Sequence, residues 1–373
     1  MKRVGAIGGG QLAAMMASAA KVLGVELIVQ TPSPEDPAVA VATDAIFAPI
    51  DDVNGTAKLA ACCDVITFEN EFVDLKALST LPLTSIFRPG LQALAPLLDK
   101  YEQRCYLRDL GLPVPKFFAV EEWGSLAQLG FPAVLKARRH GYDGQGTAII
   151  KDIVTLRHKL EASHQNQFLL EEFVPFEREL AVIAARSGTG EVVTYPIVET
   201  QQEEQVCRRV LVPADISSAV ANEIEAIAST LLNSLQAVGV FGIELFLTSD
   251  GSVIVNEISP RTHNSGHFTI EACETSQFEQ HLRAVCDLPL GSPAMCCGGA
   301  VMVNLLGYDV SLADYSAKLQ RIEQIPQAHV HWYGKTESRL GRKLGHVTVL
   351  QDNPSQAELI TIGQKIESIW YDK

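Results

Sequence analysis

Apolar and polar residues alternate in the first part of the chain with the periods of a strand, a helix and a second strand. The pattern predicts these three elements at Val4–Ile7, Gln11–Leu23 and Val25–Val29. With Gly8-Gly9-Gly10 at the first turn, they form the opening βαβ unit of a doubly wound sheet. A further strand over 64–68 ends in Glu69-Asn70-Glu71, at the strand end where such sheets bind ligands.

In the rest of the chain the pattern of apolar and polar residues predicts a mixture of helices and strands. Helical patterns cover 100–110 and 217–235, and strand patterns cover 132–136, 147–150, 167–171, 239–247 and 252–258. After Gly298 the pattern changes to a strand over 300–305, a short helical stretch and a strand over 347–350. We therefore expect three domains at 1–98, 99–298 and 299–373, with a lid subdomain at about 115–175.

The strands 239–247 and 252–258 flank Asp250-Gly251, which predicts a hairpin with a two-residue turn. That turn places Glu244 directly opposite Glu257. Side chains so paired have Cβ atoms roughly 4.5–5.5 Å apart, and like charges there repel. A hard cation such as Mg²⁺ between them would relieve the repulsion. The alternatives are an exposed pair, or a loop one residue longer that offsets the two carboxylates.

Two glycine-rich stretches are candidate phosphate sites. Gly8-x-Gly10-x-x-Ala13 fits a dinucleotide fingerprint, but Gln30-Thr31 stands where a ribose-binding acid is expected. We therefore favour another phosphate, or tight helix–strand packing, over a nicotinamide cofactor. The second stretch follows the strand that carries Lys136, where glycines let backbone amides approach phosphate oxygens. An ordinary hairpin is the alternative there.

Three further loops carry candidate chemistry. The segment Glu171–Val174 and the following Glu179 could serve an adenine edge and a ribose, or form a plain acidic turn. The loop from Pro260 to His267 is dense in polar groups directly after a strand, where sites usually lie. A third loop has four cations close together, which suggests an anion site or a solvated basic loop: Lys335, Arg339, Arg342 and Lys343.

Charge and composition narrow the class of protein. The 30 basic and 44 acidic residues give a net charge of −14, which argues against a general nucleic-acid or anionic-membrane binder. No apolar run reaches about 18 residues, so we expect no membrane span, and the glycines near the N-terminus argue against a signal peptide. The eight cysteines include no C-x-x-C spacing, which fits reduced thiols in a cytoplasmic protein.

These parts occur in the order found in ATP-grasp ligases. Two strings are more specific: K-x-R-R-x-G-Y-D-G-x-G from Lys136 and N-E-I-S-P-R-T-H-N-S-G-H from Asn256. They resemble the N5-carboxyaminoimidazole ribonucleotide synthase family, the ATPase subunit of phosphoribosylaminoimidazole carboxylase. The resemblance implies an α/β (α+β) ATP-grasp fold with a Rossmann-like pre-ATP-grasp domain and a small, β-rich C-terminal domain.

The resemblance also implies a reaction and its participants. ATP with Mg²⁺ and bicarbonate would carboxylate 5-aminoimidazole ribonucleotide, giving ADP and phosphate, on the route to purines. The family further implies a cytoplasmic homodimer that passes its product to a separate mutase.

Family roles carry over to the matching positions of this sequence. ATP would be bound by Lys100, Lys136, Gly141, Tyr142, Asp143, Gly144, Gln145, Gly146, Thr147, Glu171, Glu172, Phe173, Val174, Glu179, Gln202, Asn256 and Glu257. Mg²⁺ would be bound by Glu244 and Glu257. The ribonucleotide and bicarbonate would be bound by Gln11, Glu71, Tyr142, Arg261, His263, Lys335 and Arg342. Asp143, Arg261 and Lys335 would be catalytic. Our hypothesis is that Arg261 stabilises the transferring group, while Asp143 orients or deprotonates the attacking amine.

The sequence departs from the family pattern in three places: at Gln145 and at Gln202, where Arg and His are frequent, and at the pair Ala13-Ala14, where Gly-Arg is frequent. Another ATP-grasp ligase is an alternative, such as a biotin-carboxylase-like enzyme or formate-dependent glycinamide ribonucleotide transformylase. Ser259 stands where their E-x-N-P-R pattern has Asn, which favours the aminoimidazole branch. A non-catalytic nucleotide-binding protein is the remaining alternative, and it would need the paired glutamates to be structural.

Overall fold

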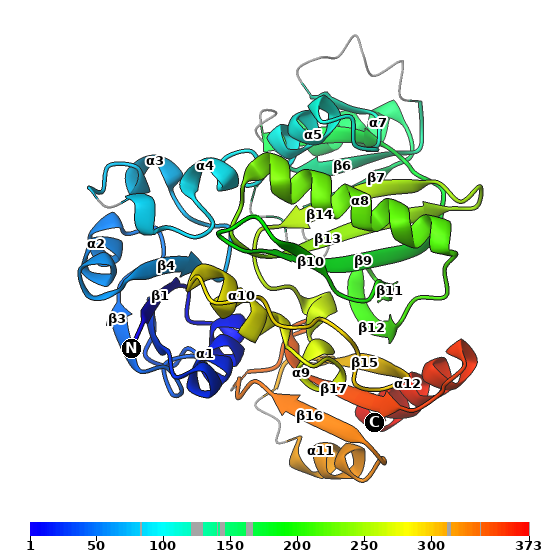
Figure 1. Cartoon of the computed structure of the whole chain (residues 1–373). Coiled ribbons are helices and arrows are strands. Elements are labelled where there is room, and N and C mark those ends of the chain that lie inside the picture. The colour runs from blue at the N-terminus through cyan, green and yellow to red at the C-terminus, as the bar shows by residue number, and fades with distance from the viewer. Residues whose placement is uncertain are drawn as a thin grey trace.

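The computed structural model describes residues 1–82, 84–120, 130–139, 141, 146–161, 167–311, 315–335 and 337–372. These residues form three sheets with helices packed on their faces (Figure 1). Among the described residues, no helix is both long enough and apolar enough to cross a membrane.

The first sheet is the parallel sheet that the opening βαβ pattern predicts. Its strands run in the order β3-β2-β1-β4, and all their pairings are parallel. The elements of this region are β1 (Arg3–Ile7), α1 (Gln11–Leu23), β2 (Glu26–Thr31), β3 (Asp44–Phe47), α2 (Val53–Cys62), β4 (Val65–Phe68), α3 (Leu75–Leu78), η1 (Thr84–Ile86) and α4 (Leu91–Leu94). Apolar residues of α1 and of the later helix α10 pack on one face, and those of α2, α3 and α4 pack on the other. The predicted strand–helix–strand order is confirmed.

The second sheet is small and antiparallel, in the order β5-β8-β6-β7. Its region contains α5 (Lys100–Asp109), β5 (Phe117–Ala119), β6 (Ala133–Ala137), β7 (Thr147–Ile150), α7 (Ile153–Glu161) and β8 (Phe168–Glu172). Helix α5 begins where Asp99 accepts hydrogen bonds from the amides of Tyr101 (2.9 Å) and Glu102 (3.3 Å). The predicted lid segment therefore has its own sheet and core.

The third sheet is large, with nine strands among the described residues, and it spans two of the predicted domains. Its main path is β14-β13-β9-β11-β12-β15-β17-β16, and β10 pairs with β9. Its strands are β9 (Phe176–Arg186), β10 (Val192–Thr194), β11 (Val198–Glu203), β12 (Val206–Val212), β13 (Gly239–Thr248), β14 (Val253–Ser259), β15 (Gly299–Leu306), β16 (Ala328–Trp332) and β17 (Lys343–Gln351). The accompanying helices are α8 (Ser218–Leu235), η4 (Asn264–Gly266), α9 (Thr269–Ala272), α10 (Gln277–Val285), α11 (Ser316–Glu323) and α12 (Gln356–Trp370).

The large sheet bears on the predicted domain boundaries. The boundary near 98 separates the parallel sheet from α5 and the small sheet, whereas no change of sheet accompanies the boundary near 298. There β15 pairs with β12, so the C-terminal strands extend the central sheet. Both boundaries stay proposals.

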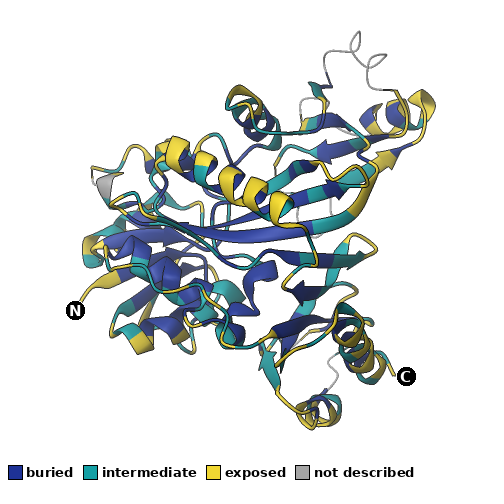
Figure 2. Ribbon diagram, turned by 45° about the vertical axis from the view of Figure 1, so that its right-hand side comes forward, coloured by how far each residue is buried: buried dark blue, intermediate teal, exposed yellow. Residues whose placement is uncertain are grey.

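Helix α8 covers one face of the large sheet and shields it from solvent. Ser217 caps the helix by accepting a hydrogen bond from the amide of Val220 (3.3 Å). Its apolar stripe packs on the strands beneath, while its outer face is exposed (Figure 2). Inward residues of β9 and β13, among them Val182 and Ile243, are fully buried under this helix. Side chains that alternate with them, such as Glu244, face the other side of the sheet.

The hairpin β13–β14 differs from its prediction in two ways that cancel. Thr248 and Ser252 close the turn by a hydrogen bond from the Thr248 amide to the Ser252 carbonyl (3.0 Å), so the loop has one residue more than predicted. A β-bulge then shifts the register between Glu244 and Leu245. Glu244 is paired with Glu257 after all. The two-residue turn was wrong, but the predicted pairing is confirmed.

Candidate active site

One cavity of about 1640 Å³ lies where the three sheets meet. Tyr142, Asp143, Gly144 and Gln145 lie outside the described residues. Every other predicted site residue except Gly146 lines the cavity: Gln11, Glu71, Lys100, Lys136, Gly141, Thr147, Glu171, Glu172, Phe173, Val174, Glu179, Gln202, Glu244, Asn256, Glu257, Arg261, His263, Lys335 and Arg342. Residues separated by more than 300 positions in sequence thus border one volume.

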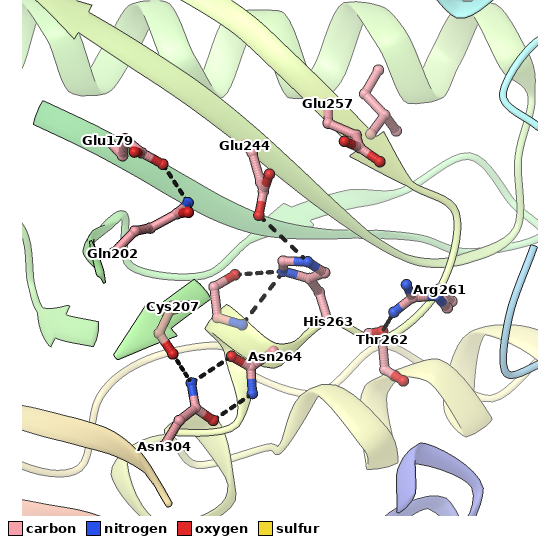
Figure 3. A network of polar contacts seen from close by, with 12 residues as sticks. Glu179, Gln202, Cys207, Glu244, Glu257, Arg261, Thr262, His263, Asn264 and Asn304 are labelled. Carbon is pink, nitrogen blue, oxygen red and sulfur yellow. Dashed lines mark hydrogen bonds and ion pairs between the residues drawn. The ribbon is translucent and has the colours of Figure 1, made fainter. Parts of the chain in front are cut away.

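The paired carboxylates lie in the cavity wall (Figure 3). Their side chains are 31% and 34% exposed, for Glu244 and Glu257 respectively. Burial and the Glu257 charge raise the pKa of Glu244. Burial also opposes ionisation of Glu257, but Lys100, which forms an ion pair with it, acts together with Lys136 and Arg104 to outweigh burial, and the pKa of Glu257 is lowered. On the other side, Nε2 of His263 lies 3.6 Å from Oε1 of Glu244.

The bulge in β14 lets two consecutive residues face the cavity. Val255 and Ile258 are buried on the α8 side of the sheet, and both Asn256 and Glu257 between them line the cavity. In a regular strand one of these two would point the other way, because side chains alternate with a period of two. Bulges of this kind are frequent beside active sites, where they redirect a side chain. Asn256 Oδ1 here accepts a hydrogen bond from Nζ of Lys136 (2.9 Å).

Lys136 belongs to a buried charge cluster that the sequence reasoning missed in part. Its Nζ lies 2.8 Å from Glu171, and Nε of Arg104 lies 2.5 Å from the other carboxylate oxygen of Glu171. Despite burial, Arg104 and Lys136 together lower the pKa of Glu171 to about 2, whereas burial lowers the pKa of Lys136. Arg104 was not predicted. Its spacing of four residues from Lys100 on a predicted helix could have revealed it, since such residues share a face.

The two glutamates of the segment Glu171–Val174, which was predicted to contact adenine, are bonded to other parts of the protein. The Glu171 carboxylate is committed to Arg104 and Lys136, and the Glu172 carboxylate accepts a hydrogen bond from the Lys116 amide (2.8 Å). The rings of Phe176 and Phe246 stack with centroids 4.6 Å apart, and both line the cavity. An apolar wall suited to a flat ring therefore lies beside this segment, and neither phenylalanine was predicted.

Glu179 and Gln202 form a pair at the same end of the cavity. Gln202 donates a hydrogen bond from Nε2 to the Glu179 carboxylate (Figure 3). Burial and the nearby Glu244 charge raise the pKa of Glu179 to about 7. The departure from the family pattern at Gln202 thus places a neutral donor on the predicted ribose ligand.

Elsewhere in the cavity wall, cations from the middle and the end of the chain contact residues that follow strands of the first sheet. Nε of Arg261 lies 2.9 Å from the Glu71 carboxylate. Nζ of Lys335 donates to Gln11 Oε1 (2.6 Å) and to the Lys343 carbonyl (2.8 Å). Of the four clustered cations, Arg339 does not line the cavity; it forms an exposed ion pair with Glu337.

The first glycine turn holds a carboxylate of the protein itself. Glu69 accepts hydrogen bonds from the amides of Gly10 (2.8 Å), Leu12 (3.1 Å) and Ala13 (3.3 Å) at the start of α1. A dinucleotide pyrophosphate would need these same donors. Of the two readings of this turn, another bound phosphate or tight helix–strand packing, the contacts with Glu69 fit the packing.

The three-part fold, the paired glutamates and the lysines that face them define an ATP-grasp enzyme. Family models agree: a ribonucleotide synthetase preATP-grasp domain matches residues 1–96, an ATP-grasp domain matches 105–278, and a phosphoribosylaminoimidazole carboxylase C-terminal domain matches 300–359. The chain belongs to the N5-carboxyaminoimidazole ribonucleotide synthase family of ATP-grasp ligases.

Individual relatives support this assignment over the full length. The chain is 51% identical to the N5-carboxyaminoimidazole ribonucleotide synthase of Synechococcus elongatus, over 99% of this chain and 96% of that protein. It is 52% identical to the synthase of Synechocystis sp., over 99% and 98% respectively. A solved structure of the Aspergillus clavatus synthase, in complex with ADP and 5-aminoimidazole ribonucleotide, is 32% identical. The superposition covers 100% of this chain and 99% of the chain in that structure, with a TM-score of 0.89.

Proposed function

We propose that the protein uses ATP and bicarbonate to carboxylate the exocyclic amine of 5-aminoimidazole ribonucleotide in purine biosynthesis. A bicarbonate oxygen attacks the γ-phosphorus of ATP, and ADP leaves. The amine nitrogen then attacks the carboxyl carbon of the carboxyphosphate so formed. Phosphate leaves, the nitrogen loses a proton, and N5-carboxyaminoimidazole ribonucleotide results.

The observation that carries this proposal is the single cavity with two differently charged ends. One end combines the paired glutamates with Lys100, Lys136 and an apolar wall, which suits a nucleotide triphosphate. The other combines Arg261, Lys335 and Arg342, which suits a second anionic substrate. Because the two ends share one volume, a phosphoryl group bound between them can reach both substrates.

Glu244 and Glu257 fit a divalent cation. They are paired across β13 and β14, and the Glu257 charge helps to raise the pKa of Glu244, so a cation between them would relieve a real repulsion. Lys100 already provides one positive charge on Glu257. When bound, Mg²⁺ would neutralise charge that develops on the phosphoryl oxygens of ATP.

The chain's own residues supply the rest of the proposed mechanism. Lys136, held by Glu171 and Asn256, is fixed to bind phosphate oxygens. Arg261, oriented by Glu71, would stabilise the transferring carboxyl or phosphoryl group. Carboxyphosphate hydrolyses readily, so the site must exclude water. We propose that Asp143, which lies outside the described residues, orients or deprotonates the amine.

The family context supports further proposals. We propose a homodimer in the cytoplasm, where the free state of all eight cysteines is expected. The product is an N-carboxylated amine, and we propose that a separate mutase moves its carboxyl group to carbon.

ADP release from ATP, Mg²⁺ and bicarbonate, with and without 5-aminoimidazole ribonucleotide, tests the function. We expect strong stimulation by the ribonucleotide. The Glu257→Gln variant should lose this stimulation, while Asp250→Asn, in the exposed turn of the same hairpin, should retain it. Stimulation by glycinamide ribonucleotide with formate, or by neither substrate, would refute the proposed reaction.

A further inference from the structure

Glu69 is a buried carboxylate with no role in the reaction proposed above. Its side chain reaches from the end of β4 to the start of α1, where it accepts three backbone hydrogen bonds. A carboxylate at a helix N-terminus is stabilised by the unpaired amides and by the helix dipole. Glu69 therefore fixes the first turn of α1 relative to the parallel sheet.

The glycine pattern of the turn is explained by this carboxylate. A Cβ atom built on Gly10 would lie 2.5 Å from Oε1 of Glu69, and one built on Gly8 would also collide with the Glu69 side chain. Gly8 in addition has a φ of +121°, which side chains rarely adopt. The glycines make room for an internal anion, so the turn serves the protein's own geometry.

The turn presents Gln11 to the cavity. Gln11 is the first residue of α1 and directly follows Gly10, whose amide is bound to Glu69. Oε1 of Gln11 accepts a hydrogen bond from Nζ of Lys335, which comes from the loop between β16 and β17. A continuous chain of contacts thus links Glu69 to the ammonium group of Lys335.

We propose that Glu69 is a positioning residue: through the glycine turn it fixes Gln11, and through Gln11 it fixes Lys335 for the ribonucleotide. The inference rests on the proposed function of the Lys335 end of the cavity. Gln11 and the Lys343 carbonyl are neutral acceptors, so each orients the ammonium group without cancelling its charge. The first domain thereby sets the place of a cation that belongs to the last part of the chain.

The test compares Glu69→Gln, Gln11→Met and the double variant in the same ADP-release assay. A glutamine at 69 keeps the shape but turns an NH₂ group toward backbone donors. We expect each single change to lower kcat/KM for the ribonucleotide about tenfold, equivalent to about 1.4 kcal/mol, and to leave the KM for ATP unchanged. The double variant should be no worse than Gln11→Met, because both act through one path.

Asp52→Ala is the matched control. Asp52 also caps a helix of the first domain, by accepting a hydrogen bond from the Asn54 amide (2.9 Å), but it does not line the cavity. This variant should lower stability without changing either KM. If Glu69→Gln does not fold, the pair Gln11→Met and Lys335→Met decides, since their effects must be non-additive.

The outcomes separate this inference from the function on which it rests. A wild-type protein that the ribonucleotide fails to stimulate would refute the proposed function. A stimulated wild type together with an unaffected Glu69→Gln would overturn the positioning role alone. Additive effects, or an equal rise in the KM for ATP, would do the same, since they indicate general destabilisation.

Discussion

Replacing Arg104 with methionine tests whether the buried charge cluster supports both stability and nucleotide binding. The Arg104 side chain is 3% exposed and that of Glu171 is 2% exposed. Arg104 bonds Glu171 through Nε at 2.5 Å and the carbonyl of Asn256 through Nη2. Methionine retains much of the side-chain volume of arginine but removes one of the two cations that pair with Glu171. Of those two, Lys136 then remains.

Two routes give the size of the effect. Removing one partner of a buried ion pair costs about 3–5 kcal/mol. The pKa of Glu171 falls from 4.5 to about 2 through Arg104 and Lys136 together, against burial, and this net shift of roughly 2.5 units corresponds to about 3 kcal/mol, the same order as the cost of losing one partner. Because the folded-state pKa is depressed, this stability is present above pH 4.5 and is lost as the pH falls toward 2. We expect Arg104→Met to lose about 3 kcal/mol at pH 7.

Urea unfolding at pH 7 and at pH 3 measures this loss, and the gap from wild type should narrow at pH 3. The KM for ATP should rise as well, because Glu171 then competes with phosphate for Lys136. Arg108→Met is the control, one turn later on α5, where the side chain is 58% exposed and pairs with the adjacent Asp109. It should cost less than about 0.5 kcal/mol. Equal losses in the two variants, or a gap that does not change with pH, would refute the reasoning.

Three further changes have defined outcomes. Glu179→Gln should gain stability relative to wild type as the pH rises from about 4.5 to about 7. Burial raises the Glu179 pKa to about 7 in the native state, so ionisation penalises the native wild type increasingly across this window, and thermal unfolding at pH 5 and 8 measures the difference. A constant difference would count against it. Asn256→Ala should raise the KM for ATP roughly tenfold by removing an acceptor of Lys136, and an unchanged KM would contradict that role. Lys335→Met should lower ribonucleotide-stimulated ADP release at least about tenfold, as expected for a hydrogen bond to a charged group, whereas the exposed Arg339→Met should not.

The hairpin β13–β14 shows how far local sequence signals reach. The Asp250-Gly251 signal correctly predicted a hairpin and the facing pair Glu244 and Glu257. It missed the longer turn and the bulge, because a bulge depends on which neighbours each face must satisfy. Here Val255 and Ile258 must both pack under α8, and the bulge leaves Asn256 and Glu257 together on the cavity side.

The glycine turn Gly8–Gly10 shows what local sequence signals cannot predict. Its spacing is compatible with a bound phosphate, and the missing ribose acid argued only against one class of ligand. The occupant is Glu69, more than 50 residues away in sequence, and only the parallel pairing of β1 with β4 brings it there. No local pattern could have distinguished an internal carboxylate from an external phosphate, because both satisfy the same amides.

By itself the sequence determined the elements whose pattern is local: the βαβ start, α5, α8, the hairpin and the polar loop after Glu257. The sequence also determined in which order the nucleotide-binding and metal-binding side chains follow one another, because the resemblance to the family rests on the sequence strings that begin at Lys136 and Asn256. The tertiary structure alone decided which charges meet: Arg104 with Glu171, Gln202 with Glu179, and Lys335 with Gln11. It also joined the C-terminal strands to the central sheet. These outcomes depend on contacts between distant segments, whose energies come from burial and pairing in the folded state and leave no periodic signal along the chain.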